Sequence, residues 1–287
     1  MPASPQELVE LLDLETIDLN LFRGRQPDTS LQRVFGGQVA AQALVAASRT
    51  VDERVEIHSM HSYFLRPGDT AVPIVYDVDR VRDGRSFATR RVLARQHGRP
   101  IYALTASFHV HEDGFEHQDR MPQVPSPEDS DDAASLMLED SDRRKQWERE
   151  WSVLELRRAA DSLPGGLFAG GEQVSRVAYW IRVTPTLPDD VLVHRAALTY
   201  VSDMTLLGAT LVLHGEHPTS ATMQAASLDH TVWFHRPHRA DEWLLYDQTS
   251  PSAVGARGLA FGKLFTQDGR LVASVAQEGL IRPRRDG

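Results

Sequence analysis

The spacing of hydrophobic and polar positions divides the chain into two similar runs of elements, each with one apolar helix. Leucines in residues 5–13 share one face of a short amphipathic helix, with Ser4 as its N-cap. Strand-like stretches follow near 16–25 and 31–35, and the alanine-rich segment GGQVAAQALVAAS then begins at Gly36. Few bulky polar residues lie on any side of this segment, so it predicts a helix that is buried all round.

Strand-like stretches rich in Val, Ile, Tyr and Phe fill the rest of both halves, and turn signals such as Asp83-Gly84 and His97-Gly98 separate them. This pattern predicts antiparallel hairpins. In the second half, VLELRRA and VAYWIRV read as strands, and Asp189-Asp190 can cap a long helix that begins near Val191. The other expected strands are 57–66, 71–82, 86–96 and 100–111 in the first half, and 221–236, 242–250, 256–267 and 270–281 in the second.

Residues 115–150 have a different composition. MPQVPSPEDSDDAAS is rich in proline, serine and acidic residues, which indicates an exposed linker. LMLEDSDRRKQWEREW mixes charges of both signs, which indicates a solvated helix. The segment therefore reads as a surface connector between the two halves.

Short matches between the halves indicate an internal duplication. Residues 64–67 (FLRP) match 234–237 (FHRP) at an offset of 234 − 64 = 170, and Gly98-Arg99 matches Gly269-Arg270 at 269 − 98 = 171. A buried helix followed by antiparallel strands indicates a sheet wrapped around that helix. We expect an α+β double hot-dog fold of two tandem repeats, with limits 1–114 for the first repeat, 115–150 for the connector and 151–287 for the second repeat.

Composition and charge limit the functions that this chain could have. The formal net charge of −9 disfavours nucleic acid as a partner, because phosphate binding needs a basic surface. The absence of cysteine excludes disulfides, thiolate zinc sites and a cysteine nucleophile. The N-terminal stretch lacks the basic and apolar regions of a secretory signal, and no apolar run is long enough to span a bilayer. We expect a cytoplasmic enzyme.

Several common catalytic motifs are missing. Gly84-Arg85-Ser86-Phe87-Ala88 lacks the final glycine of a GxSxG elbow and lies between strands. There is no P-loop and no HExxH motif. His109 and His111 share a strand face and could be metal ligands, although two surface histidines explain them better. We expect no metal ion and no organic cofactor.

Asp203 is the polar residue that fits its surroundings least. The segment from Ala196 to Leu213 is apolar or small nearly all round apart from this carboxylate. Burial of an ionised carboxylate costs several kcal/mol, roughly, unless it is paired or hydrogen-bonded. The alternative is an N-cap, in which Ser202 or Asp203 starts a new helical segment and aims free backbone N–H groups at the same place.

Two further polar residues interrupt apolar strands. Gln277 lies in LVASVAQEG, and a buried amide needs hydrogen-bond partners, whether structural or catalytic. Ser227 lies in MQAASLDHTVWF without a histidine base at a serine-hydrolase spacing, which favours a water-orienting or structural role over a nucleophilic serine. Asp229 shares its strand face and is a rival carboxylate. At an offset of 171, Ala106 stands opposite Gln277, which predicts one active site per chain.

The sequence strongly resembles the type II (TesB-type) acyl-CoA thioesterases over nearly its whole length except the connector. Four stretches carry the resemblance, namely Val34 to Gln38, His58 to Asp69, Leu228 to Pro237 and Thr266 to Gly279. The resemblance implies a double hot-dog fold, an acyl-CoA substrate, a homo-oligomer and a catalytic set of Asp, Thr or Ser, and Gln. On this chain the set falls on Asp203, Ser227 and Gln277, with serine where the family often has threonine.

We therefore expect hydrolysis of fatty acyl-CoA to the free acid and CoA. In this hypothesis Asp203 accepts a proton from a water that Ser227 and Gln277 orient. The expected substrate-binding residues are Phe35, Gly36, Gly37, Gln38 and His61. The GGQ segment supplies either oxyanion donors or substrate contacts, or it serves only close helix packing. Two alternatives are a hot-dog hydratase with an Asp–His pair drawn from His58, His61 or His230, and a non-catalytic acyl-CoA sensor.

Overall fold

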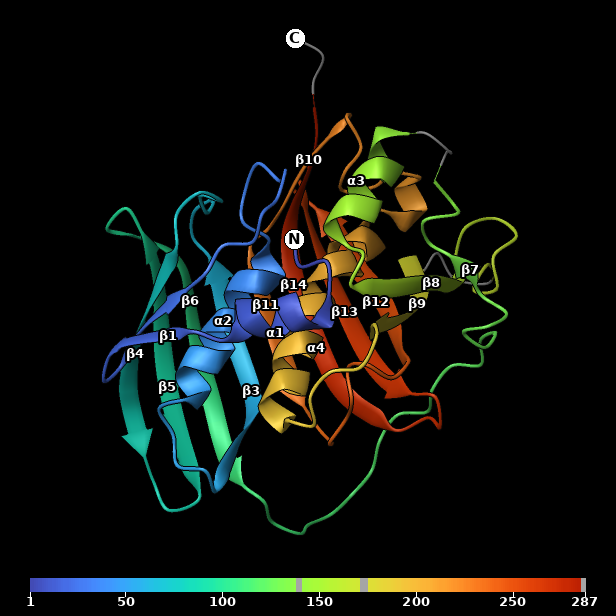
Figure 1. Ribbon diagram of the computed structural model, residues 1–287. Coiled ribbons are helices and arrows are strands. Elements are labelled where there is room, and N and C mark those ends of the chain that lie inside the picture. Colours follow the sequence, from blue (N-terminus) through green and yellow to red (C-terminus); the bar gives the residue numbers. More distant parts are fainter. Residues whose placement is uncertain (138–140, 171–174, 285–287) are drawn as a thin grey trace.

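A single antiparallel sheet forms one layer of the molecule, and the helices lie on one of its faces (Figure 1). The computed structural model describes residues 1–137, 141–170 and 175–284. The first-half strands are β1 (Glu15–Asp18), β2 (Leu21–Gly24), β3 (Val55–Phe64), β4 (Ile74–Asp83), β5 (Phe87–Gln96) and β6 (Arg99–Val110). The later strands are β7 (Asp131–Asp132), β8 (Leu154–Asp161), β9 (Ser175–Val183), β10 (Met223–Ser227), β11 (Asp229–Phe234), β12 (Leu244–Val254), β13 (Arg257–Thr266) and β14 (Leu271–Pro283).

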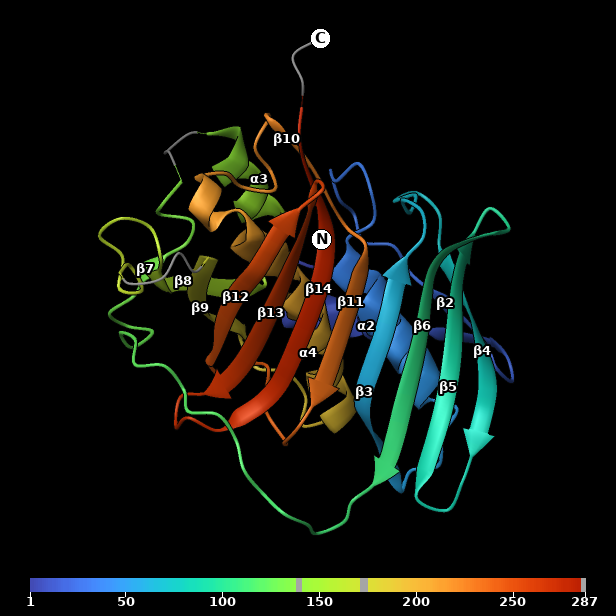
Figure 2. The ribbon, with the colours of Figure 1, turned by 180° about the vertical axis from the view of Figure 1, so that it is seen from behind.

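The two halves of the sheet join between β3 and β11. The strand order is β1-β2-β4-β5-β6-β3-β11-β14-β13-β12-β9-β8-β7, and β10 pairs with β14. In the antiparallel junction Asp229 lies opposite Tyr63 and Trp233 lies opposite Ser59. The junction brings the second half of the chain directly against the first, so side chains from both halves can meet near it (Figure 2).

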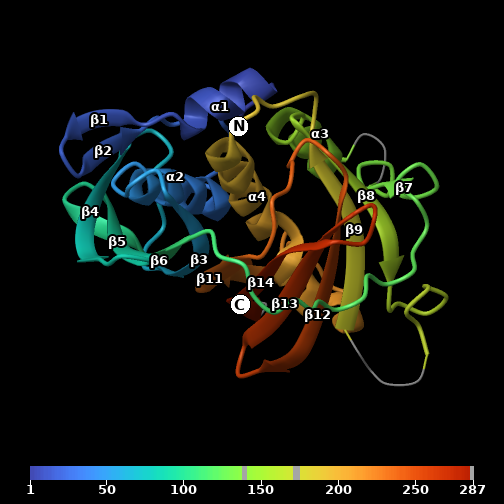
Figure 3. The same cartoon turned by 90° about the horizontal axis from the view of Figure 1, so that it is seen from below.

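The helices are α1 (Pro5–Leu12), α2 (Gly36–Ser48), α3 (Asp142–Glu150) and α4 (Val191–Thr205), followed by 3-10 turns at Leu206–Thr210 and Val212–His214. Ser4 caps α1 by accepting from the Glu7 N–H, and Asp190 caps α4 in the same way. In α2 every residue from Gly37 to Ala47 is buried, which confirms the prediction of a helix enclosed on all sides. Figure 3 shows α2 and α4 side by side, with the sheet bending around α4 toward β8.

The predicted α+β fold and its principal elements are confirmed, with local differences. Residues 31–35 form no strand, because this loop crosses to the end of β3 and the Val34 N–H donates to the Gly68 carbonyl. The expected strand 221–236 is two strands, broken at Leu228, whose carbonyl accepts from the Phe64 N–H of the first half. The predicted limits of the two repeats stay a prediction.

The segment 115–150, predicted to be a surface connector, is mostly exposed, but some of its side chains pack against the rest of the molecule. Met121 and Val124 pack on the outer face of the sheet against a cluster that includes Trp180 and Leu245. The Trp180 indole N–H donates to the Pro125 carbonyl at 2.8 Å. Residues 138–140, at the start of the expected charged helix, lie outside the described residues. The segment is polar overall, but its few apolar side chains pack against the apolar cluster that includes Trp180 and Leu245.

Candidate active site

A cavity of about 930 Å³ lies between the two halves of the fold. Its wall comes from the start of α2, the turn after β3, helix α3, strands β8 and β9, the end of α4, and strand β10. Asp203 and Ser227 both line it. The structure therefore brings two of the three predicted catalytic residues to one cavity wall, although 24 positions separate them in the chain.

Asp203 sits in the last turn of α4, and only 5% of its side chain is exposed. Its Oδ1 accepts from Gln277 Nε2 at 2.5 Å and from Ser227 Oγ at 3.4 Å, which is at the long end for a hydrogen bond. The Gly37 backbone N–H also donates to its carboxylate. The N-cap alternative is wrong, because α4 continues through Asp203 to Thr205.

Burial is the largest influence on the Asp203 carboxylate, and it raises the pKa. Hydrogen bonds from Gln277, Gly37 and Ser227 favour the ionised form and oppose this effect. The balance raises the pKa of Asp203 from 3.8 to about 6. The carboxylate is thus ionised at neutral pH yet more basic than an exposed aspartate, which is what a general base requires.

The start of α2 approaches this carboxylate so closely that only glycine fits there. A Cβ on Gly36 would lie 2.6 Å from Asp203 Oδ2, and a Cβ on Gly37 would lie 2.3 Å from the Tyr200 carbonyl oxygen of α4. The first N–H groups of α2 have no partners within the helix and carry its positive dipole end. A helix start does aim N–H groups at Asp203, as the sequence suggested, but it belongs to the other half of the chain.

Gln277 lies behind Asp203 and holds several groups together. Besides Asp203, its Nε2 contacts Ser227 Oγ at 3.1 Å and His230 Nδ1 at 3.3 Å. Gln277 is fully buried on β14, and its Oε1 has no hydrogen-bond partner in the described part of the chain. The amide is thus oriented with its nitrogen toward the carboxylate.

His230 fixes that orientation, and its tautomer follows from its neighbours. The Ser202 hydroxyl donates its single proton to the Thr199 carbonyl at 2.9 Å. Ser202 Oγ therefore accepts from His230 Nε2, 2.8 Å away, which leaves His230 Nδ1 without a proton and able to accept from Gln277. Burial lowers the pKa of His230 to about 3, so the ring is neutral and its 3.9 Å contact with Asp203 is not an ion pair.

The sequence offers His230 only as a candidate hydratase histidine and does not place Ser202 beside it. The two residues are 28 positions apart. No local pattern marks them, because His230 lies on the inward face of β11 and meets α4 only in the folded chain.

One side of the cavity is apolar. Trp147 and Trp151 line it together with aliphatic residues of β8, β9 and the end of α4. Trp151 makes an edge-to-face contact with Phe35, whose ring centroid is 4.9 Å away. The connector, predicted to be solvated, therefore supplies part of the cavity wall.

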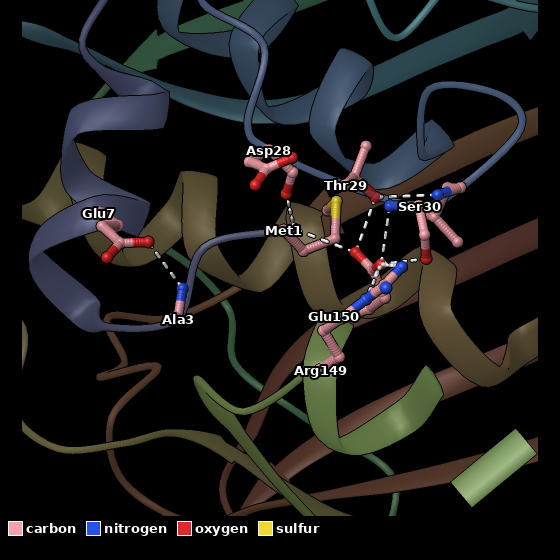
Figure 4. A network of polar contacts seen from close by, with 9 residues as sticks. Met1, Ala3, Glu7, Asp28, Thr29, Ser30, Arg149 and Glu150 are labelled. Atoms are coloured by element: carbon pink, nitrogen blue, oxygen red, sulfur yellow. Dashed lines mark hydrogen bonds and ion pairs between the residues drawn. The ribbon is translucent and has the colours of Figure 1, made fainter. Parts of the chain in front are cut away.

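Glu150 anchors this wall (Figure 4). Its buried carboxylate accepts from the Ser30 backbone N–H at 2.9 Å and from Thr29 Oγ1 at 2.7 Å, and it also contacts the Met1 ammonium group. Burial raises the pKa of Glu150, but the hydrogen bonds from Ser30 and Thr29 outweigh it and hold the pKa far below its usual range. The ionised Glu150 ties α3 to the loop that leads into α2.

Of the residues predicted to bind substrate, Phe35 and Gly36 line the cavity, whereas Gly37, Gln38 and His61 do not. The Gln38 amide is buried and donates to Gln26 Oε1 at 3.0 Å, so it secures the loop before α2. His61 is exposed and packs edge-to-face on Trp233, because its position on β3 alternates to the face opposite the helices.

The rival candidates do not reach the cavity wall either. Asp229 accepts from the Glu278 backbone N–H at 2.6 Å. His109 contacts Glu112 and stacks on Phe87. Within residues 1–137, 141–170 and 175–284, no group of three or more His, Cys, Asp or Glu side chains is arranged to hold a metal ion.

Comparisons with known proteins identify the family of this chain. The profile of the family described as acyl-CoA thioesterase N-terminal domain matches residues 25–109, and that of acyl-CoA thioesterase matches residues 157–280. Acyl-CoA thioesterase 2 of Haemophilus influenzae is 40% identical, with 96% of each chain covered. Acyl-coenzyme A thioesterase 8 of Homo sapiens is 39% identical, with 95% of this chain and 88% of the relative covered.

Solved structures share the whole fold. The acyl-CoA thioesterase II TesB2 of Mycobacterium marinum has a TM-score of 0.82 and is 46% identical, with 96% of this chain and 98% of that chain covered. A hot-dog-fold protein of Alicyclobacillus acidocaldarius has a TM-score of 0.77 at 20% identity, with 97% of this chain and 98% of that chain covered, and it shows the fold alone. The chain belongs to the TesB-type acyl-CoA thioesterase II family, with its double hot-dog fold.

The comparisons leave the compartment open. A relative in Saccharomyces cerevisiae, 26% identical with 86% of this chain and 85% of the relative covered, is named a peroxisomal acyl-coenzyme A thioester hydrolase. None of the helices described for this chain is long and apolar enough to cross a membrane. The cytoplasmic location and the homo-oligomer stay predictions.

Proposed function

We propose that this protein hydrolyses fatty acyl-CoA to the free acid and CoA with a water that Asp203 activates. One observation carries the proposal: a nearly buried carboxylate with a raised pKa lies in a cavity wall, held by Gln277, Ser227 and the start of α2. Family membership supports the substrate class, and the geometry supports the assignment of the base.

In the proposed reaction Asp203 takes a proton from water, and the oxygen of that water forms a bond to the thioester carbon. The C–S bond breaks as the tetrahedral intermediate collapses. The proton on Asp203 passes to the departing CoA thiolate, which restores the carboxylate. The Gly37 N–H already donates to Asp203, so the neighbouring N–H groups in the first turn of α2 are the candidate donors to the developing oxyanion.

Two residues act as positioning groups in this proposal. Gln277 donates one amide N–H to the Asp203 carboxylate, and its second amide hydrogen is shared between the Ser227 hydroxyl and the unprotonated Nδ1 of His230. Ser227 Oγ, which lines the cavity beside Asp203, is the acceptor near the base for the second O–H of the water.

The hydratase alternative fits the site less well. It needs a histidine that exchanges a proton with substrate beside an aspartate. His230 lies near Asp203, but it is fully buried and neutral, and both its ring nitrogens have partners. His58 instead contacts Ser107 Oγ at 2.9 Å, and His61 is exposed on the outer face. This difference favours hydrolysis.

The proposal is tested by following free thiol release from acyl-CoAs of increasing chain length, with wild type and Asp203→Asn in parallel. We expect release by wild type and a loss of roughly 10²- to 10⁴-fold in the variant, the usual contribution of a general base. Tight binding without release would indicate a sensor, and addition of water to enoyl-CoA would indicate a hydratase. Near-normal release by a folded Asp203→Asn protein would refute the role of Asp203.

A further inference from the structure

Two arginines line the cavity at its polar rim, outside the group around Asp203. Arg33 belongs to the loop before α2, and Arg66 belongs to the turn after β3. A backbone hydrogen bond of 3.1 Å from Val34 to Gly68 joins the two segments. A Cβ on Gly68 would lie 2.9 Å from the Val34 side chain, so the loops are in direct contact.

The duplicated fold contains a counterpart that shows what is unusual about Arg66. Arg66 Nη1 donates to the Pro100 carbonyl at 2.7 Å, and in the second half Arg236 Nη1 donates to the Leu271 carbonyl at 2.9 Å. The backbone N–H groups of the two arginines likewise donate to equivalent carbonyls on the neighbouring strands. The two guanidinium groups thus occupy matching places in the two repeats.

The two arginines differ in what their remaining nitrogens contact. Arg236 forms an ion pair with Glu116 at 3.1 Å, and it does not line the cavity. Arg66 is exposed at the cavity, and no carboxylate pairs with it among the described residues. Arg33 is also exposed, and its guanidinium makes no hydrogen bond or ion pair within the described chain. Two unpaired cations therefore face the same opening.

The charge of the whole protein makes this opening distinctive. The chain carries a formal net charge of −9, so its average field repels an anionic ligand. CoA carries its negative charge on phosphate groups remote from the thioester, and arginine is well suited to phosphate because its planar donors match the oxygens. Arg33 and Arg66, which have no carboxylate partner among the described residues, supply a local positive charge at the rim against this average field.

We infer that Arg33 and Arg66 form the site that holds the phosphate groups of CoA, an inference that rests on acyl-CoA as the proposed substrate. The inference also orients the substrate. The thioester lies at Asp203, the acyl chain lies on the apolar side formed by Trp147 and Trp151, and the nucleotide lies at the Arg33–Arg66 rim. Phe64 packs on Gly36 beside Asp203, and Arg66 follows it by two residues in the chain, so the turn after β3 connects the reacting centre with the rim.

The test compares Arg33→Gln and Arg66→Gln with the matched control Arg236→Gln. Each protein is assayed with an acyl-CoA and with the same acyl group on pantetheine, which has no phosphate. We expect each rim variant to raise KM for acyl-CoA about tenfold with kcat unchanged, the effect of about one charge-assisted contact. With acyl-pantetheine all four proteins should agree, and Arg236→Gln should match wild type on both substrates.

An equal rise in KM on both substrates, or no rise on either, would overturn the inference. Binding of CoA itself, measured by calorimetry, separates this inference from the proposed hydrolysis. If CoA binds wild type at least tenfold more tightly than the Arg33→Gln/Arg66→Gln double variant, the phosphate site stands even where no thioester is cleaved. Equal binding of CoA by the two proteins would refute it, whatever the hydrolytic activity.

Discussion

Replacement of Asp203 by asparagine should lower the hydrolytic activity and should make the protein more stable, relative to wild type, as pH rises. Asp203 has a pKa raised from 3.8 to about 6 because the folded chain buries it. Between these two values the folded state holds a proton that the unfolded chain has lost. The free energy of unfolding of the wild type therefore falls as pH rises through this window. Above it, the buried, ionised carboxylate destabilises the folded state.

The magnitude follows from the same two values. A pKa difference between 3.8 and about 6 corresponds to roughly 3 kcal/mol over the full titration, at 1.36 kcal/mol per pKa unit. From pH 5 to pH 8, the raised pKa of Asp203 lowers the free energy of unfolding by roughly 1.4 kcal/mol. Asparagine does not titrate, so the Asp203→Asn protein lacks this loss. Its absolute stability also reflects the changed hydrogen bonds to Gln277 and Gly37, but that offset is the same at both pH values.

The measurement is denaturant unfolding of both proteins at pH 5 and pH 8, with the difference in free energy of unfolding compared between the two conditions. We expect wild type to lose roughly 1.4 kcal/mol relative to the variant as pH rises. In parallel, kcat/KM of the wild type should rise with pH through an apparent pKa near 6, because only ionised Asp203 accepts a proton. If the free energies of unfolding of wild type and Asp203→Asn change in parallel with pH, and kcat/KM shows no transition near pH 6, the raised pKa of a buried Asp203 is refuted.

Three further predictions follow from the site. His230→Asn keeps an acceptor near the place of Nδ1 and should retain most of kcat. His230→Gln keeps only a donor toward Ser202, so the Gln277 amide is no longer held and kcat should fall about tenfold or more. Equal kcat for the two variants in the thiol-release assay would contradict this. Ser227→Ala should lower kcat about tenfold through the lost bond to the carboxylate, and Ser227→Thr should stay within a few-fold of wild type; an active Ala variant beside an inactive Thr variant would count against the hydroxyl. Trp147→Ala should raise KM for long-chain acyl-CoA and leave acetyl-CoA unchanged, because the side chain lines the apolar side of the cavity; a chain-length profile identical to wild type would exclude it from the acyl site.

Local patterns in the sequence were enough to predict most of the elements. Helix α2 follows from its alanine-rich, weakly polar composition, and α4 follows from the Asp190 cap and the apolar run after it. Strand alternation and turn residues gave the hairpins. Asp203 and Gln277 stood out because a polar side chain in an apolar element needs a reason, and both lie in the group around the cavity wall.

The connector shows where such patterns fail. Its composition is dominated by charged and small residues, which indicate exposure on average. Trp147 and Trp151 nevertheless line the cavity, and Glu150 is buried because its carboxylate meets donors from residues about 120 positions earlier in the chain. A periodicity averaged over neighbours does not reveal one side chain that finds a distant partner.

The sequence by itself determined that this chain has two sheet-and-helix units, a carboxylate out of place in a helix, and no local partner for it. Only the tertiary structure decided what surrounds that carboxylate. The Gly37 N–H reaches it across the contact between α2 and α4, and the Ser202 hydroxyl sets the His230 tautomer that holds Gln277. Residues that are neighbours along a helix or strand share a period that a sequence displays. Contacts between elements depend instead on which surfaces pack together, and this is fixed only when the two halves fold against each other.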